Sequence, residues 1–227
     1  VVRAHRKCAS FGIATGRSLE SALKVMRKAG IPMPDVLITS LGGAIHFAPE
    51  YAMDLAWMRH IDHLWSPAAV RAVLDALPGL KRQPQPEQGR FKISYYIDPQ
   101  IAPPLEEITR LLHQAEQTVN ATLSFGQFLD VLPVRASKGF AVRWFADQWG
   151  VPLEQILVAG GSGADEDMMR GNTLAVVVAN RHNAELRTLP EAARIHFAQA
   201  GYARGILEAI AHYDFYRSCR APAAEAA

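Results

Sequence analysis

Three short segments of this sequence combine residue types that can hold an anion or a metal at the end of a β-strand. The first is Ala14-Thr15-Gly16-Arg17-Ser18, in which Gly16 lets the backbone approach a ligand and Thr15 offers a hydroxyl. A helix follows directly, and its first turn presents free N–H groups and the positive end of the helix dipole. The segment is therefore a candidate anion site, although an ordinary turn capped by Ser18 has the same composition.

The second segment is Ser137-Lys138-Gly139, which stands immediately before a predicted helix. A lysine at a helix N-terminus is unfavourable, because its charge opposes the helix dipole. A bound phosphate or a cluster of carboxylates would offset that charge. The alternative is a solvated lysine, which is the commoner fate of a single Lys.

The third segment is the loop Gly160-Gly161-Ser162-Gly163-Ala164-Asp165-Glu166-Asp167, which follows the apolar run 156–159. Acidic residues in the first turn of a helix often serve only to complement its dipole. An acidic loop at the end of a strand is also where Mg²⁺ is held beside a phosphate. The loop is thus a candidate metal site.

The order of the elements predicts an α/β fold with a parallel sheet and helices on both faces. Strands are predicted at 10–15, 35–40, 155–159, 174–179 and 193–197, and helices at 19–29, 138–149, 164–169 and 204–213. Ligands of such sheets lie beyond the carboxyl ends of the strands, where the three segments stand.

The middle of the chain has a different pattern and predicts a small inserted layer. Helices are predicted at 66–77 and 105–116, and strands at 91–97, 119–123 and 128–132. This order lacks the spacing of parallel crossovers and favours an α+β domain. We place it at residues 49–130, inserted into a core domain formed by residues 1–48 and 131–227.

Composition excludes several classes of protein. The chain has 227 residues and a formal net charge of +2, with scattered Lys and Arg, so nucleic acid is not an expected partner. It has no apolar run long enough to span a membrane and no secretion signal, so we expect a cytoplasmic protein. In a reducing compartment Cys8 and Cys219 are expected as free thiols rather than a disulfide, and residues 221–227 as a frayed tail.

Taken in order, the three segments resemble motifs two, three and four of the haloacid-dehalogenase (HAD) phosphatases: a strand-end Thr, a Lys and an acidic glycine loop. Residues 11–18, 34–40, 129–133 and 136–139 resemble the sucrose-phosphate phosphatase family in particular. Residues 158–180 are most similar to the phosphatase-like C-terminal domain of bacterial sucrose-phosphate synthases. The resemblance extends from Arg3 to Phe215.

The resemblance implies a HAD-like Rossmannoid core, a cap and a role for each matching residue. Thr15, Gly16 and Arg17 would bind the phosphoryl oxygens, and Lys138 would be the catalytic group that neutralises the phosphate. Asp165 would support Mg²⁺. The inserted layer would be the cap that selects the sugar, where Asp130 is either a ligand of a sugar hydroxyl or a carboxylate of the hinge.

The sequence departs from the family in three ways. The family's aspartate nucleophile and its general acid–base lie on a strand before the first helix, and the roughly 20–25 residues of that strand-loop-helix unit are not in this sequence. Inside the acidic loop, Gly161 stands where the family has Asp, and Ala164 stands where it has Asn. Gly43-Ala44 also replaces a Thr-Glu pair. These losses indicate a damaged catalytic site.

Two hypotheses for function follow. In the first, the chain is a non-catalytic or weakly catalytic part of a sucrose-phosphate synthase. It binds a sugar phosphate such as sucrose 6-phosphate, or docks against the glycosyltransferase domain or a sucrose phosphatase. In the second, it is a working Mg²⁺-dependent sucrose-6-phosphate phosphatase whose nucleophile lies outside this sequence, or a phosphatase for another sugar phosphate such as mannosyl-phosphoglycerate.

Overall fold

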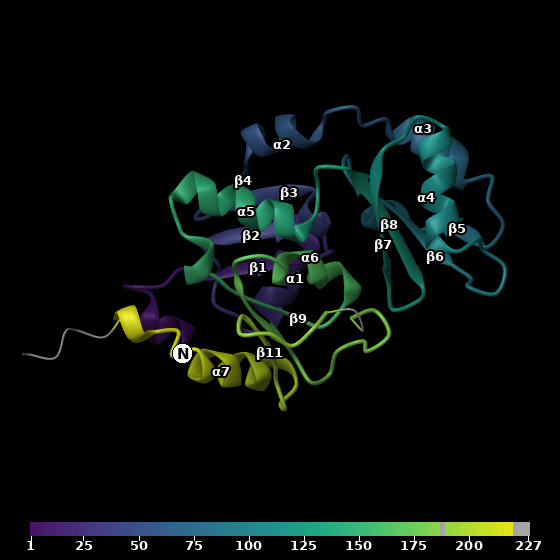
Figure 1. Cartoon of the computed structure of the whole chain (residues 1–227). Helices are drawn as coiled ribbons and strands as arrows, with labels where there is room; N and C mark the ends of the chain where they lie inside the picture. Colours follow the sequence, from purple (N-terminus) through teal and green to yellow (C-terminus); the bar gives the residue numbers. More distant parts are fainter. Residues whose placement is uncertain (187–188, 220–227) are drawn as a thin grey trace, which may run out of the picture.

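The structure is a computed structural model that describes residues 1–186 and 189–219. It has a core with two sheets and a cap with one, and the cap stands to one side of the core (Figure 1). The predicted α/β class is confirmed. The tail predicted at 221–227 lies outside the described residues. No helix among the described residues has the length and hydropathy that crossing a membrane requires.

The first core sheet mixes parallel and antiparallel pairing. Its order is β1 (Gly12–Ala14), β2 (Val36–Thr39), β3 (Ala44–Phe47) and β4 (Ala52–Met53). β1 and β2 are parallel and are connected through α1 (Leu19–Lys28), whose N-cap Ser18 accepts a hydrogen bond from the Ser21 N–H. β3 and β4 return antiparallel after the short turn η2 (Ser40–Gly42). These two strands were not predicted.

The second core sheet is parallel throughout and has the order β11-β10-β9. Its strands are β9 (Leu157–Gly160), β10 (Leu174–Val177) and β11 (Ile195–Phe197), with η4 (Leu153–Gln155), η5 (Gly163–Asp165), α6 (Glu166–Met169) and α7 (Tyr202–His212) around them. Ala209 of α7 packs on Val176 of β10. Within the described residues, β9 pairs only with β10 and β1 only with β2, so the core has two separate sheets.

One hydrophobic core nevertheless serves both sheets. It contains Val36 and Ile38 from β2 together with Val158 from β9 and Val177 from β10. Helices α2 (Leu55–Ile61) and α5 (Lys138–Trp149) contribute further apolar side chains to the same cluster. Packing of side chains, rather than a ladder of backbone hydrogen bonds, therefore holds the two sheets together.

The cap is an antiparallel sheet with two helices on one face. The sheet order is β5 (Leu80–Arg82), β6 (Ile93–Ile97), β8 (Phe128–Pro133) and β7 (Val119–Ser124). α3 (Pro67–Leu74) and α4 (Leu105–Gln114) cover one face, and η3 (Gln85–Glu87) lies in a loop. Ile93 and Tyr95 pack toward the helices, so the alternate residue Ser94 faces the opposite side. The predicted 119–132 strand pair is confirmed.

Two elements inside the expected cap range 49–130, β4 and α2, pack with the core sheets. β4 pairs with β3, and Trp57 and Ile61 of α2 are buried in the hydrophobic core of the two core sheets. The Trp57 indole Nε1 also donates a hydrogen bond to the Gly42 carbonyl at 2.9 Å. The elements of the cap itself therefore run from α3 to β8.

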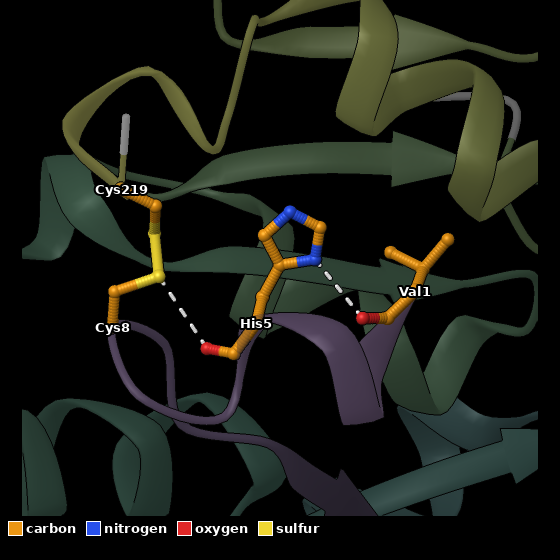
Figure 2. The surroundings of a disulfide bond; sticks show 4 residues. All are labelled: Val1, His5, Cys8 and Cys219. Carbon is orange, nitrogen blue, oxygen red and sulfur yellow. Dashed lines mark hydrogen bonds between the residues drawn. A yellow bond between two sulfur atoms is a disulfide. The ribbon is translucent and has the colours of Figure 1, made fainter. Parts of the chain in front are cut away.

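The expectation of two free thiols is wrong, because Cys8 and Cys219 form a disulfide (Figure 2). Cys8 follows the short helix η1 (Val2–His5), and Cys219 ends η6 (Arg217–Cys219). The two Cα atoms are 5.5 Å apart although the residues are 211 positions apart in sequence. The sequence does not predict this contact, because it forms only where the segments before β1 and after α7 meet in the folded chain.

Candidate active site

A cavity of about 220 Å³ lies where the core meets the cap. The core lines it with Leu41 from η2, with residues at the start of α5, and with the acidic loop after β9. The cap lines it with side chains from β7 and β8. The lining includes Leu41, Asn120, Thr122, Ser137, Lys138 and Asp167.

Lys138 is the first residue of α5, and it is buried with 7% of its surface exposed. The hydroxyl of the N-cap Ser137 accepts a hydrogen bond from the Phe140 N–H at 3.0 Å. The Lys138 Nζ donates to Asp165 Oδ1 at 2.6 Å. The unfavourable interaction of the Lys138 charge with the helix dipole is therefore offset by the Asp165 carboxylate.

Asp165 is held by donors on both of its oxygens. Its Oδ2 accepts hydrogen bonds from the Gly161 N–H and the Ser162 N–H, each at 3.0 Å, and from the Ser162 hydroxyl at 2.9 Å. Burial alone would raise the pKa of Asp165. The Lys138 ammonium and the two backbone donors outweigh burial and lower that pKa below its ordinary value. Asp165 is thus kept ionised beside Lys138.

Asp167 caps the start of α5 from the neighbouring loop. Its two carboxylate oxygens each lie 3.1 Å from the Gly139 N–H, and the Ser137 hydroxyl donates to Oδ2. A Cβ at position 139 would lie 2.6 Å from the Asp167 backbone oxygen, so this close approach requires glycine. The negative carboxylate also complements the helix dipole. Hydrogen bonds from Ser137, Lys138 and Gly139 to the two aspartates of the acidic loop therefore join the two segments.

Thr15, Gly16 and Arg17 do not line the cavity, but Thr15 and Gly16 contact Leu41, which does. The Thr15 carbonyl accepts the Leu41 N–H at 3.0 Å, and a Cβ at Gly16 would lie 3.3 Å from the Leu41 side chain. Thr15 Oγ1 accepts the Arg17 N–H at 3.2 Å, while the Arg17 guanidinium donates to Ser21 Oγ at 3.2 Å. Phosphate binding by Thr15, Gly16 and Arg17 stays a prediction.

Gly42 is what brings Leu41 next to Lys138. Its φ is +97°, and a Cβ there would lie 2.1 Å from the Ser137 carbonyl oxygen. Any side chain at this position would collide with the backbone at the start of α5, quite apart from the strain of a positive φ. The turn after β2 therefore packs directly on the lysine segment.

Sequence reasoning missed Asn120 and Thr122, which line the cavity from β7. The Asn120 Nδ2 donates to the Ala136 carbonyl at 2.9 Å and ties the cap to the core. The signal was present in the strand, where polar Asn120, Thr122 and Ser124 alternate with apolar residues. Period-two alternation places these polar side chains on one face of the cap sheet.

Asp130 lies on the same face of the cap sheet, directly opposite Ser94 on β6 and Thr122 on β7. Its Oδ1 accepts hydrogen bonds from Ser94 Oγ at 2.5 Å and from Lys92 Nζ at 3.3 Å. Asp130 is buried and is not among the cavity-lining residues, whereas its cross-strand neighbour Thr122 is. Contact of Asp130 with a sugar hydroxyl stays a prediction.

The described residues do not by themselves fit a magnesium site. Mg²⁺ requires a near-octahedral shell of oxygens, usually built on one or two carboxylates. Asp165 Oδ1 faces the Lys138 ammonium and Oδ2 takes three donors, while Gly161 and Ala164 carry no oxygen on their side chains. Residues 1–186 and 189–219 contain no group of three His, Cys, Asp or Glu side chains able to hold a metal.

The sequence and the fold have counterparts in known proteins. A model of the sucrose-6F-phosphate phosphohydrolase family matches residues 1–214. The sucrose-phosphatase of Synechocystis sp. PCC6803, solved with sucrose and phosphate, superposes with a TM-score of 0.89 at 31% identity. That match covers 94% of this chain and 88% of the cyanobacterial one.

Two curated relatives are similar over 88% of this chain. The mannosylfructose-phosphate phosphatase of Agrobacterium fabrum is 26% identical, over 81% of its own length. The glucosylglycerol-phosphate synthase of Pseudomonas anguilliseptica is 27% identical, over 26% of its own length. The chain spans about half the length of the Arabidopsis thaliana sucrose-phosphatases that it matches. The chain belongs to the sucrose-6F-phosphate phosphohydrolase family of the HAD superfamily.

Proposed function

We propose that this chain binds a sugar phosphate, with sucrose 6-phosphate as the leading candidate, in a site that does not release phosphate at an enzymatic rate. The observation that carries the proposal is that the acidic loop leaves neither Asp165 oxygen free to bind Mg²⁺ in the way the family requires. Asp165 is committed to Lys138 and to the backbone of Gly161 and Ser162, and Gly161 supplies no second carboxylate. Direct ligands are at least as important as their outer partners, whose loss alone costs 10–100-fold in metal affinity or activity.

The chemistry of the cavity supports binding of a sugar phosphate. Lys138 lines the cavity from the core side and places an ammonium group there, next to its partner Asp165. Asn120 and Thr122 offer hydrogen bonds to sugar hydroxyls from the cap side. At about 220 Å³ the cavity is smaller than the roughly 300–1,000 Å³ of typical ligand sites, so we expect the cap to open for a disaccharide phosphate.

The proposed setting is a larger protein of sucrose synthesis. The chain's similarity to about a quarter of a glucosylglycerol-phosphate synthase supports a place within a sugar-phosphate synthase. In that setting the partner is the glycosyltransferase domain of a sucrose-phosphate synthase or a separate sucrose phosphatase. The module would then retain the product of the synthase until a competent phosphatase receives it.

The test is phosphate release and binding measured on the same preparation. We expect no phosphate release from sucrose 6-phosphate with Mg²⁺ above that of the Lys138→Met variant, together with calorimetric binding that the same variant loses. Gly161→Asp with Ala164→Asn is the matched control for the loop, and it should raise Mg²⁺ affinity. A Cβ at Gly161 meets Val178 Cγ2 at 3.1 Å, so small local shifts accompany it. Turnover of about 1–10³ s⁻¹ by the natural loop would overturn the proposal.

A second function is favoured by the division of the core into two sheets. β1 and β9 each leave one edge without a strand partner in the described residues. Beyond β1, Thr15 is bonded to the cavity-lining Leu41, and beyond β9, Gly161 is bonded to Asp165, the partner of Lys138. A parallel strand placed between these edges would deliver its last residue next to Lys138. A working phosphatase whose aspartate nucleophile lies on such a strand is the alternative. Phosphate release by a chain extended with the upstream coding sequence, but not by residues 1–227, would establish it.

A further inference from the structure

The disulfide between Cys8 and Cys219 links segments that belong to different halves of the core (Figure 2). Cys8 lies in the segment that leads into β1, the edge strand of the first sheet. Cys219 lies at the end of the segment that follows α7, the helix packed on the second sheet. Other contacts fasten each segment to its own sheet.

The Cys8 segment is fastened to the first sheet through Asp35, the residue before β2. The Arg6 guanidinium binds both Asp35 oxygens, with Nη2 at 2.6 Å from Oδ1. Asp35 Oδ2 also accepts the Phe11 N–H at 2.8 Å, next to the start of β1. Residues on both sides of Cys8 are therefore fixed to the β1–β2 pair.

The Cys219 segment is fastened to the second sheet in an equivalent way. The Tyr213 hydroxyl donates to the Ala175 carbonyl of β10 at 3.1 Å. Further along, the Tyr216 ring stacks on the His5 ring with 3.8 Å between centroids, which brings the two segments together. The disulfide then closes the contact covalently.

We propose that the Cys8–Cys219 disulfide is a reducible clamp that joins the two sheets of the core. The described strands of the two sheets share no backbone ladder, so the disulfide is a covalent link where the hydrogen-bonded sheet is interrupted. After reduction, the first sheet is held to the β9–β11 sheet by side-chain packing and by the His5–Tyr216 stack. This inference does not depend on the proposed function.

The site suits reduction by a dithiol, either a thioredoxin-type protein or a small dithiol. Cys8 is exposed and Cys219 is partly exposed. A thiolate of the reductant attacks one sulfur, breaks the S–S bond and forms a mixed disulfide, which the second thiol of the reductant then resolves. Two electrons and two protons pass to Cys8 and Cys219, and the reductant leaves as its own disulfide.

The surroundings also accommodate the reduced form. The His5 carbonyl oxygen lies 3.4 Å from Cys8 Sγ (Figure 2). A sulfur in a disulfide has no proton to donate, but a thiol at this place can donate to that carbonyl. A hydrogen-bond acceptor for the Cys8 thiol is therefore already present in the oxidised structure.

The experiment compares the full 227-residue chain after oxidation by oxidised glutathione and after reduction by dithiothreitol. Alkylation followed by mass spectrometry should find no free thiol in the oxidised protein and two in the reduced protein. Reduction should lower Tm by about 5–15 °C, because the bond closes a loop of 211 residues in a chain of this size. Backbone amides of β1 and β9 should exchange faster in the reduced protein.

Two variants make the result specific to the clamp. Cys8→Ser with Cys219→Ser should unfold at the Tm of the reduced protein, whether or not reductant is present. Arg6→Gln loosens the same segment without touching a cysteine, and it should keep its response to reductant. Two alkylated cysteines in the glutathione-oxidised protein, or equal Tm and equal amide exchange in the two redox states, would refute the clamp.

Discussion

The core and the cap each bury a lysine–aspartate pair, and the two pairs are built differently. Lys138 and Asp165 in the core are 2.6 Å apart, while Lys92 and Asp130 in the cap are 3.3 Å apart. All four side chains are at most 12% exposed. Burial is therefore similar, and the pairs differ in the distance between their charged atoms and in their other hydrogen-bond partners.

Those partners differ in number and in kind. Asp165 takes three further donors from Gly161 and Ser162, which lie in the loop after β9. For Asp130 the further donor is the Ser94 hydroxyl on the neighbouring strand. Donors directed at a carboxylate favour its ionised form. The core pair is thus organised to keep a charge at the cavity, whereas the cap pair fastens two strands of a sheet.

Removing the lysine of the core pair should have the largest effect. Lys138→Met leaves an ionised Asp165 buried with its backbone donors but without a counter-charge. Breaking one partner from a buried ion pair costs about 3–5 kcal/mol of the free energy of unfolding. Urea denaturation of the variant and the wild type at pH 7 measures this loss.

A double variant separates charge from packing at the same position. Lys138→Met with Asp165→Asn keeps an amide oxygen that can accept from the Gly161 and Ser162 N–H groups while removing both charges. We expect it to recover most of the stability lost in the single variant. If the single variant unfolds at the wild-type urea concentration, the pair does not have the role assigned here.

Removing the lysine of the cap pair should have a smaller effect. Lys92→Met removes the charge-assisted hydrogen bonds from Nζ to Ser94 Oγ at 2.7 Å and to Asp130 Oδ1 at 3.3 Å, for which we expect a loss of about 1.5–3 kcal/mol. It leaves the Ser94 hydroxyl bonded to Asp130. The same urea series measures it. Because Lys92 does not line the cavity, binding of sucrose 6-phosphate should weaken far less than in Lys138→Met. Equal losses of binding in the two variants would contradict the distinction between the pairs.

The sequence indicated that Lys138 needs a negative partner but did not name Asp165, which was expected to support Mg²⁺, and it gave no indication of the cap pair. A lysine at a helix N-terminus is electrostatically unfavourable, so Lys138 pointed to a nearby negative partner and Asp165 proved to be that partner. Lys92 carries no such local signal, because its partner lies across a strand pairing that only the folded sheet creates.

The same reasoning explains the other differences between prediction and structure. α5 was predicted to the residue, and the ends of α1, α4 and α7 were predicted to within two residues, since helix periodicity is local. β3 and β4 are short and follow η2, where the non-glycine residues Ser40 and Leu41 have positive φ angles that composition does not reveal. The disulfide joins the two ends of the chain, and no local pattern reports that two distant segments meet.

The smallest expected effect is the dependence of the core pair on pH, and it tests whether charge is what distinguishes this pair. The folded state lowers the pKa of Asp165 despite its burial, chiefly through Lys138. The pair's stabilisation is therefore fully present above the ordinary Asp pKa of about 4 and is lost as the pH falls through the lower folded-state value.

The difference in unfolding free energy between wild type and Lys138→Met should then shrink as the pH falls from 6 toward 2. Urea titrations at several pH values measure it, with Lys138→Met/Asp165→Asn as the reference that lacks the titrating group. A gap that stays constant with pH would mean that Lys138 stabilises the core by packing alone, and the contrast with the cap pair would then lie in packing and not in charge.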